Sequence, residues 1–70
     1  MRTFAIYQDT TQGRVRWGVF TCRGTSVREV SRQFTTMYPD AARHGALYVA
    51  ARRRICGRWV DDVPVPMEVK

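Results

Sequence analysis

Two runs in which apolar and polar side chains alternate limit the fold of this chain most strongly. Residues 3–8 read TFAIYQ and residues 14–22 read RVRWGVFTC, with the polar segment 9–13 (DTTQG) between them. Alternation with a period of two is the pattern of β-strands with one buried face, and a short polar loop ending in glycine joins such strands into a hairpin. The sequence therefore predicts an antiparallel β-hairpin at the start of the chain.

The register of this hairpin follows from where its loop closes. A loop over residues 9–12 puts Gln8 opposite Gly13 and sorts the other pairs into an apolar side and a basic side. The sorted pairs are Phe4 with Trp17 and Ile6 with Val15 on the apolar side, and Ala5 with Arg16 and Tyr7 with Arg14 on the basic side. We prefer this register because it separates the two kinds of side chain cleanly.

Helical spacing replaces the alternation after the hairpin. Ser26 and Glu29 have the spacing of a capping box, which marks a helix N-terminus. The apolar face is expected to hold Val27, Val30, Phe34 and Met37, and the opposite face Arg28, Ser31, Arg32 and Thr35. Pro39 disfavours a helical Tyr38, so we expect the helix to end or kink there. Residues 39–44 are expected to form one further turn before Gly45.

The last third of the chain returns to strand patterns. Residues 46–52 (ALYVAAR) and 58–63 (RWVDDV) predict a second hairpin, closed either by a tight loop around residues 52–55 or by a turn at Cys56 and Gly57. The first alternative pairs Leu47 with Val60, Tyr48 with Trp59 and Ala46 with Asp61. Residues 63–70 contain two prolines, which predict an edge strand or an extended tail.

Together these elements predict an α+β fold, a single ββαββ domain over residues 1–70 with one helix packed on one face of an antiparallel sheet. A chain of 70 residues buries only about 60% of its unfolded surface, which leaves room for one small domain. The expected core is Phe4, Ile6, Val15, Trp17, Val19, Val27, Val30, Phe34, Met37, Leu47, Val49 and Val60.

The charge balance narrows the class of partner. Twelve Lys+Arg against six Asp+Glu give a formal net charge of +6, and eleven of the twelve basic residues are arginine. Such a domain attracts polyanions, namely nucleic acid, an acidic protein face or an anionic membrane. The charge excludes a protein that mimics the phosphates of DNA. The preference for arginine over lysine is typical of a GC-rich coding sequence.

A sheet with one helix leaves one face for water or a partner. On the registers above, this open face carries Tyr7, Arg14, Arg16, Tyr48, Arg52 and Trp59. Aromatic rings stack on bases while arginines pair with phosphates, and the same residue types dominate hot spots of protein interfaces. The alternative interpretation is a solvated face with a cation–π pair between Tyr7 and Arg14.

The densest charge is the run Arg52, Arg53 and Arg54, with Arg58 close by. It is either a loop that binds phosphates or an acidic protein patch, or a hairpin tip exposed to solvent. We favour the binding role because only Asp61 and Asp62 lie nearby to compensate these charges.

Residues for catalysis or metal binding do not fall into a recognisable pattern. Cys22 and Cys56 lie far apart and His44 is the only histidine, so the paired spacings of a zinc site are absent. Asp61 and Asp62 are adjacent on a predicted strand and point to opposite faces, which rules out a carboxylate dyad. We expect a protein without enzymatic activity, metal or cofactor.

The sequence also gives an expectation about location. The N-terminal residues lack the apolar stretch of a signal peptide, and no run approaches the roughly 20 apolar residues that span a bilayer. We therefore expect a cytoplasmic protein with reduced thiols, no membrane partner, and a monomeric or small homo-oligomeric state.

In length, element order and composition the chain resembles small phage-encoded proteins that disable host machinery. These include type I anti-CRISPR proteins and phage inhibitors of bacterial RNA polymerase. Several basic type I anti-CRISPR proteins combine an antiparallel sheet with a helix and have an end similar to residues 57–61 (GRWVD). The resemblance implies a non-enzymatic inhibitor, acting in the host cytoplasm, that docks on a CRISPR surveillance complex or RNA polymerase and blocks it.

Two other functions fit the same residues. The chain could bind nucleic acid directly, through its Arg/aromatic sheet face on single strands or its Arg-rich hairpin on duplex. A third hypothesis is a structural or assembly protein that oligomerises through its edge strand.

Overall fold

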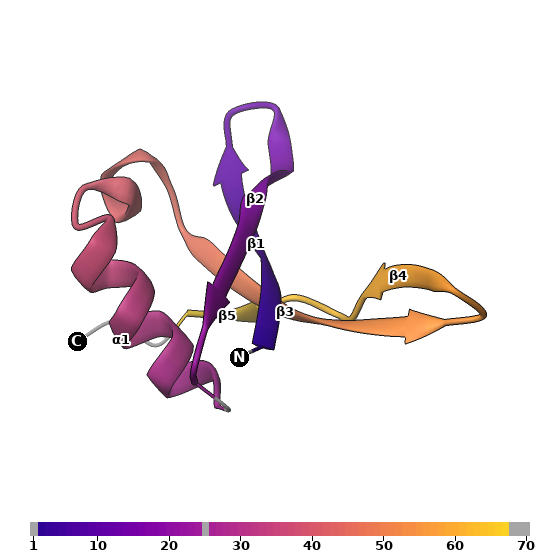
Figure 1. The fold of residues 1–70 in the computed structure, drawn as a ribbon. Coiled ribbons are helices and arrows are strands. Elements are labelled where there is room, and N and C mark those ends of the chain that lie inside the picture. Colours follow the sequence, from indigo (N-terminus) through magenta and orange to yellow (C-terminus); the bar gives the residue numbers. More distant parts are fainter. Residues whose placement is uncertain (1, 25, 68–70) are drawn as a thin grey trace.

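A computed structural model describes residues 2–24 and 26–67. The elements are β1 (Arg2–Thr10), β2 (Gly13–Cys22), α1 (Val27–Met37), a 3-10 helix (Ala41–His44), β3 (Leu47–Ile55), β4 (Arg58–Asp61) and β5 (Val65–Pro66). The sheet runs in the order β2-β1-β3-β4, with β5 also beside β3, and every pairing is antiparallel (Figure 1). The expected α+β class and antiparallel sheet with one helix are confirmed, and a short strand is added to the expected ββαββ order.

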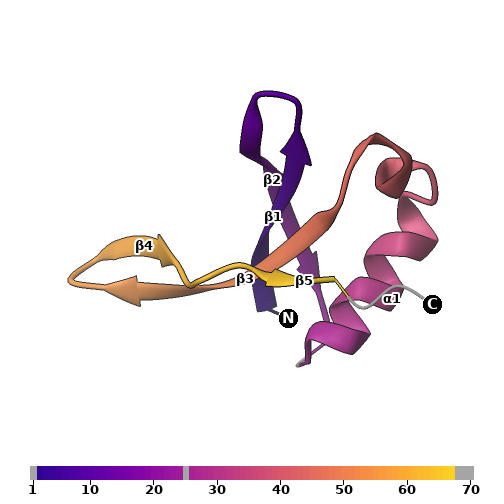
Figure 2. The same cartoon turned by 180° about the vertical axis from the view of Figure 1, so that it is seen from behind.

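Helix α1 lies against one face of the sheet, as the two opposite views in Figures 1 and 2 show. Val30 and Phe34 of the helix are fully buried, and the Phe34 ring meets the Phe20 ring of β2 edge to face at 5.3 Å. The buried cluster comprises Phe4, Ile6, Phe20, Cys22, Val30, Phe34, Ala41, Leu47, Val49 and Met67. The helix has the expected ends, because the Ser26 side chain accepts a hydrogen bond from the Glu29 N–H and Tyr38 caps the last turn.

The register predicted for the first hairpin is wrong, because the loop is shorter than expected. Thr10 pairs with Gly13, so only Thr11 and Gln12 lie in the loop. The Thr10 hydroxyl stabilises this tight loop by donating to the Gly13 carbonyl oxygen at 2.8 Å and accepting from the Gln12 N–H at 3.2 Å. Gly13 has a φ of 111°, a conformation that glycine adopts without strain.

A β-bulge in β2 adds a second departure. Tyr7 pairs with Arg16 whereas Ile6 pairs with Gly18, which leaves Trp17 as an extra residue without an opposite partner. An extra residue reverses the alternation of side chains beyond it. The helix side of β2 therefore carries Phe20 and Cys22, and Val19, expected in the core, is 45% exposed on the other side.

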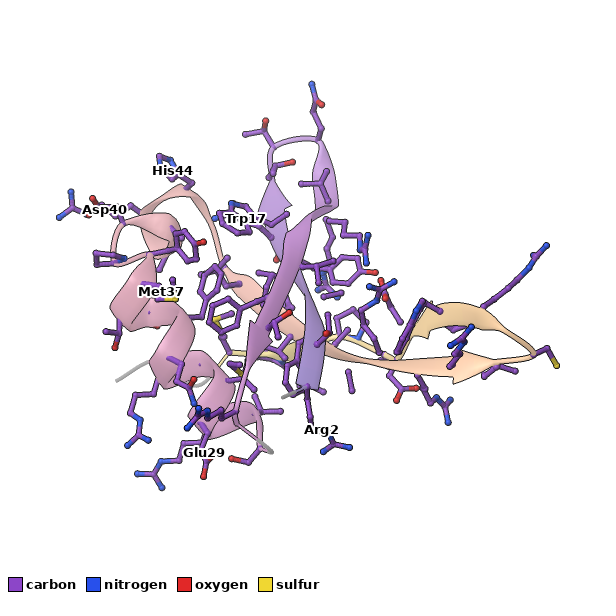
Figure 3. All side chains as sticks on the ribbon, viewed as in Figure 1. Arg2, Trp17, Glu29, Met37, Asp40 and His44 are labelled. Carbon is purple, nitrogen blue, oxygen red and sulfur yellow. The ribbon has the colours of Figure 1, made fainter. Side chains whose placement is uncertain are left out.

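Four further residues expected in the core lie at the surface. These are Val15, Trp17, Met37 and Val60, and a fifth, Val27, is half-buried. Trp17 keeps part of its ring against the core, at 5.2 Å from both Phe34 and Tyr38, and lies between α1 and the first hairpin in Figure 3. Ser31, expected on the outer face of the helix, is buried, and its hydroxyl is satisfied there by donating to the Val27 carbonyl oxygen at 2.7 Å.

The second hairpin closes at Cys56 and Gly57, so the competing register is correct and the loop around residues 52–55 is wrong. Ile55 pairs with Arg58, and the φ values of Cys56 and Gly57 are 50° and 79°. Positive φ at both central residues is the requirement of a type I′ turn, whose twist matches that of the flanking strands. The pairs expected for Leu47, Tyr48 and Ala46 with β4 are therefore absent, and Asp61 pairs with Arg52.

This hairpin forms an arm, which we define as residues 52–61, that projects away from the rest of the molecule (Figures 1 and 2). Beyond Ala51, which pairs with Phe4, β3 leaves β1 and continues with β4 alone. Every residue from 53 to 60 is exposed. The arm therefore has no hydrophobic core of its own, and both of its sides are accessible.

The end of the chain runs back along β3. Val65 and Pro66 pair with Val49 and Tyr48, and the Met67 N–H donates to the Leu47 carbonyl oxygen at 2.9 Å. Residues 68–70 of the expected tail lie outside the described residues. Among the described residues, no helix has the length and apolar character needed to cross a membrane.

Candidate functional site

The face of the sheet opposite α1 carries two clusters, each built around one aspartate. We define the sheet face as Tyr7, Asp9, Arg14, Arg16, Tyr48, Arg52 and Asp61. The strands β1, β2, β3 and β4 all contribute to it, because their side chains alternate between the two faces. Three arginines of the predicted binding face thus lie beside two carboxylates.

The first cluster surrounds Asp61 at the base of the arm. The Tyr7 hydroxyl donates to Asp61 Oδ2 at 2.6 Å, Arg16 Nε lies 3.1 Å from the same oxygen, and Arg52 Nε lies 3.1 Å from Oδ1. Partial burial disfavours the charged carboxylate, but the Tyr7 hydrogen bond and the charges of Arg16 and Arg52 outweigh it and lower the pKa of Asp61. The same hydrogen bond, reinforced by burial, raises the pKa of Tyr7.

The second cluster surrounds Asp9 near the tip of the first hairpin. The Tyr48 hydroxyl donates to Asp9 Oδ2 at 2.8 Å, and Arg14 Nε lies 3.1 Å from Oδ1. The Arg14 guanidinium also stacks over the Tyr48 ring, 3.7 Å from its centroid. The hydrogen bonds from Tyr48 and then Arg14 lower the pKa of Asp9.

Local backbone contacts hold Asp9 where it meets its partners. Its N–H donates to the Ala46 carbonyl oxygen at 2.9 Å, and the neighbouring buried Gln8 donates through Nε2 to the Ala41 carbonyl oxygen at 2.8 Å. Gly45 lies between these contacts with a φ of 148°, and a Cβ on it would collide with the Asp9 carbonyl oxygen. The 3-10 helix and Gly45 therefore fix this part of β1.

The sheet face is consequently not the uncompensated basic surface that the sequence predicts. Arg14 stacks on Tyr48 rather than on Tyr7, which lies opposite Arg16. Neither aspartate is among the predicted site residues, although the register that pairs Ala46 with Asp61 places the Asp61 carboxylate on the open face. The predicted register puts Asp9 in the loop, whereas a two-residue turn pairs it with Arg14, five residues further on.

The arm presents its arginines differently. Arg53 forms an ion pair with Asp62 at 3.0 Å between side chains that are 62% and 42% exposed. Arg54 and Arg58 form no ion pair with any residue in the described ranges 2–24 and 26–67. Such exposed guanidinium groups can bind an anion without first breaking an ion pair with a carboxylate.

Trp59 is the aromatic residue of the arm. It pairs with Arg54 across the ladder and is 56% exposed. The Arg52 guanidinium, itself held by Asp61, lies 5.4 Å from the centroid of the Trp59 ring. The arm therefore combines an oriented but accessible indole with two arginines, Arg54 and Arg58, that have no ion pair within the described part of the chain.

The nine residues predicted for the binding site thus divide into two groups. The sheet face contains Tyr7, Arg14, Arg16, Tyr48 and Arg52, and the remainder of the arm contains Arg53, Arg54, Arg58 and Trp59. Arg52 links the groups, because it contacts both Asp61 and Trp59.

Groups with metal-binding or thiol chemistry are scattered. Within the part of the chain that the structure describes, no group of three or more His, Cys, Asp or Glu side chains could hold a metal ion. Both cysteines are free thiols: Cys22 is buried in the core, and Cys56 is exposed at the turn of the arm. No protein-family model, curated protein or solved structure matches this chain.

Proposed function

We propose that this chain is a non-enzymatic nucleic-acid-binding protein that contacts its ligand through the arm. One observation carries the proposal: the arm projects from the body with residues 53–60 exposed and with Arg54 and Arg58 free of ion pairs among the described residues. Binding of phosphates by such groups releases condensed counterions, which is the main source of affinity for nucleic acid.

The distribution of side chains on the arm suits a polyanion on either side. In a two-stranded ribbon the residues of a ladder pair share one side, so Arg54 lies with Trp59 and Arg58 lies with Ile55. The ladder of four pairs is roughly 13 Å long, and exposed rings and arginines together bind bases and backbone. The sheet face is a weaker candidate, because a phosphate there has to displace Asp9 or Asp61 from the arginines.

The proposal is tested by the salt dependence of binding. A labelled single-stranded oligonucleotide of about 20 nucleotides is titrated with the protein, and anisotropy is recorded over a salt series. If about three arginines contact phosphates, the logarithm of the association constant falls by about two for each tenfold rise in salt. Absence of binding at low salt, or an affinity that does not change with salt, contradicts the proposal.

A second candidate function is an inhibitor that docks the arm on a host nucleic-acid-handling complex, such as a CRISPR surveillance complex or RNA polymerase. It is favoured by two apolar residues on the side of the arm away from Trp59, Ile55 and Val60, which are 47% and 41% exposed. Phosphate binding makes no use of these side chains, whereas a protein interface buries such residues at its centre.

A pull-down from nuclease-treated bacterial lysate tests this second function. The tagged protein is compared with the double variant Ile55→Ser and Val60→Ser, which keeps every arginine. Retention of one such complex by the wild type, and its loss with the variant, supports docking through the arm. If both proteins retain the same material, or neither retains such a complex, the inhibitor hypothesis is contradicted.

A further inference from the structure

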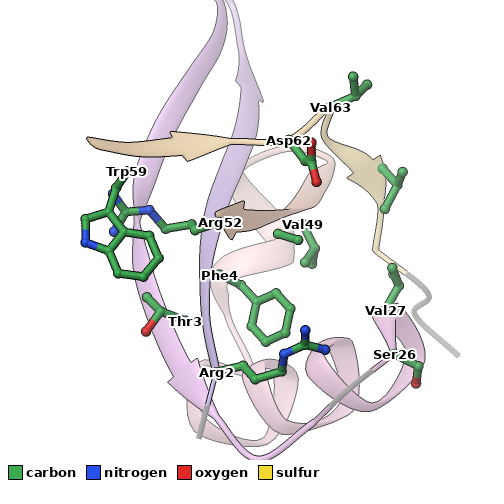
Figure 4. Close-up of a pocket in the computed structure, with 12 residues that line it drawn as sticks. Arg2, Thr3, Phe4, Ser26, Val27, Val49, Arg52, Trp59, Asp62 and Val63 are labelled. Carbon is green, nitrogen blue, oxygen red and sulfur yellow. The ribbon is translucent and has the colours of Figure 1, made fainter. Parts of the chain in front are cut away.

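A groove opens at the root of the arm, where β1 and β3 separate. Phe4 and Ala51 form the last ladder pair between these strands, and β3 then continues into the arm while β1 begins at Arg2. The groove has a volume of about 610 Å³ (Figure 4). This is within the range of about 300–1,000 Å³ that is typical of sites for small organic groups.

The walls of the groove differ in chemistry. Its floor contains the buried apolar side chains of Phe4 and Val49, and one wall contains the exposed indole of Trp59. Arg2 lies at another edge of the groove, below Phe4 in Figure 4, and forms no ion pair with a residue of the described ranges. An apolar floor, an aromatic wall and a free cation are what a nucleotide needs for its base and its phosphate.

We propose that this groove receives one unpaired base of a single-stranded nucleic acid. The inference rests on the proposed function and deepens it, because it names the form of nucleic acid. The base stacks on Trp59 above the apolar floor, and the flanking phosphates lie against Arg2 and against Arg54, which is on the same side of the arm as Trp59. Asp62 at the rim accepts a hydrogen bond from the base edge, and its ion pair with Arg53 compensates its charge.

Two physical reasons favour a single strand over a duplex. The base of a duplex is stacked on both faces and paired along its edge, so it enters a groove only after it has been extruded. A base of a single strand is not paired along its edge, so it enters the groove at a lower cost. Arg52 also orients the indole in advance, since the Asp61 carboxylate holds its guanidinium beside the ring.

Tryptophan fluorescence tests the inference directly, because the chain contains only Trp17 and Trp59. Trp17→Phe leaves Trp59 as the reporter, and Trp59→Phe leaves Trp17, which lies on the helix side near Tyr38. We expect oligo(dT) of about 12 nucleotides to quench the fluorescence of Trp17→Phe strongly and that of Trp59→Phe little. If Trp17→Phe fails to fold, as monitored by circular dichroism, the difference between the wild type and Trp59→Phe gives the same signal.

Affinities measured with labelled oligonucleotides complete the test. Trp59→Ala is expected to weaken binding of the single strand about tenfold, and a duplex of equal length is expected to bind more weakly than the single strand. Unchanged fluorescence at saturation, an unchanged affinity of Trp59→Ala, or a duplex that binds at least as tightly overturns the groove site. In each of these results the oligonucleotide is still bound, so the proposed function stands, whereas absence of binding refutes both.

Discussion

The sheet face and the arm are made of the same kinds of residue, arginine and aromatic side chains, yet they differ in what those residues contact. Arg14, Arg16 and Arg52 of the sheet face lie about 3.1 Å from a carboxylate oxygen. Arg54 and Arg58 of the arm have no such partner among the described residues. The comparison shows that the fold, rather than the residue type, decides which arginines keep a charge that no carboxylate compensates.

The two regions also differ in what supports them. The sheet face belongs to strands that bury the core on their other side, and Asp9 is fixed by contacts with the segment 41–46. Beyond its base, where Asp61 contacts Tyr7 and Arg16, the arm is supported only by its own ladder and a tight turn. An isolated two-stranded hairpin is only marginally stable in water, so we expect the arm to adjust to a ligand more readily than the sheet face.

The largest expected effect is a loss of stability, which compares a glycine that supports the sheet face with a glycine in the turn of the arm. Gly45→Ala places a Cβ against the Asp9 carbonyl oxygen at a φ of 148°, and it is expected to lower the free energy of unfolding by about 2–4 kcal/mol. Gly57→Ala is the matched control, because Gly57 also has a positive φ but no atom lies within 4 Å of its added Cβ. Gly57→Ala is expected to lower the free energy of unfolding by about 1 kcal/mol. Urea denaturation measures both variants. Equal losses would contradict the difference in support.

The next effect concerns the two aspartates at the base of the arm. Asp61→Asn removes the charge that Arg16 and Arg52 share, and the free energy of unfolding is expected to fall by about 1–2 kcal/mol. Asp62→Asn removes an equal charge from an exposed ion pair with Arg53 and is expected to change it by less than about 0.5 kcal/mol. Thermal or urea denaturation of both variants checks this, and a larger loss for Asp62→Asn would show that the clusters do not stabilise the sheet face.

The pH dependence of stability gives a smaller and more specific signal. The folded chain lowers the pKa of Asp61 below its ordinary value of 3.8, so the unfolded chain binds protons first as the pH falls. The contribution of Asp61 is therefore complete above about pH 5 and is lost as the pH falls below the ordinary value through the lower folded pKa. Urea denaturation of the wild type and of Asp61→Asn between about pH 2.5 and about pH 6 measures how this contribution of Asp61 to the free energy of unfolding changes with pH. If the free energies of unfolding of the two proteins change with pH in parallel, Asp61 makes no such contribution.

Local signals in the sequence were sufficient for part of the fold. The capping residue Ser26 and the Tyr38–Pro39 break fixed both ends of the helix, and the alternating runs fixed the antiparallel strands. The register of the first hairpin could not be predicted from such local signals. The segment 9–13 is compatible with loops of two or four residues, and the bulge at Trp17 leaves no mark in an alternating pattern.

The candidate site was harder to predict than the fold. Its arginines and aromatic residues could be selected by type, but whether they are available depends on contacts between residues far apart in the sequence. One such contact is the hydrogen bond between Tyr7 and Asp61, which are 54 residues apart. A shift of two residues in a hairpin register keeps the same side chains on a face and changes every partner. The sequence therefore identifies the residues of such a surface more reliably than it identifies their ion pairs.

The central claim is that the arm, rather than the sheet face, binds nucleic acid. Three double variants, each lowering the net charge by two, test it most directly: Arg54→Gln with Arg58→Gln in the arm, Arg14→Gln with Arg16→Gln on the sheet face, and Arg28→Gln with Arg32→Gln on the exposed side of α1. Their affinities for the same labelled single strand are measured at one moderate salt concentration.

We expect the arm variant to bind about 10- to 30-fold more weakly than the wild type, because it loses two phosphate contacts. The sheet-face and helix variants are expected to change the affinity by less than about threefold, since they alter only the overall field. Equal losses in all three variants, or the largest loss in the sheet-face variant, would contradict the claim.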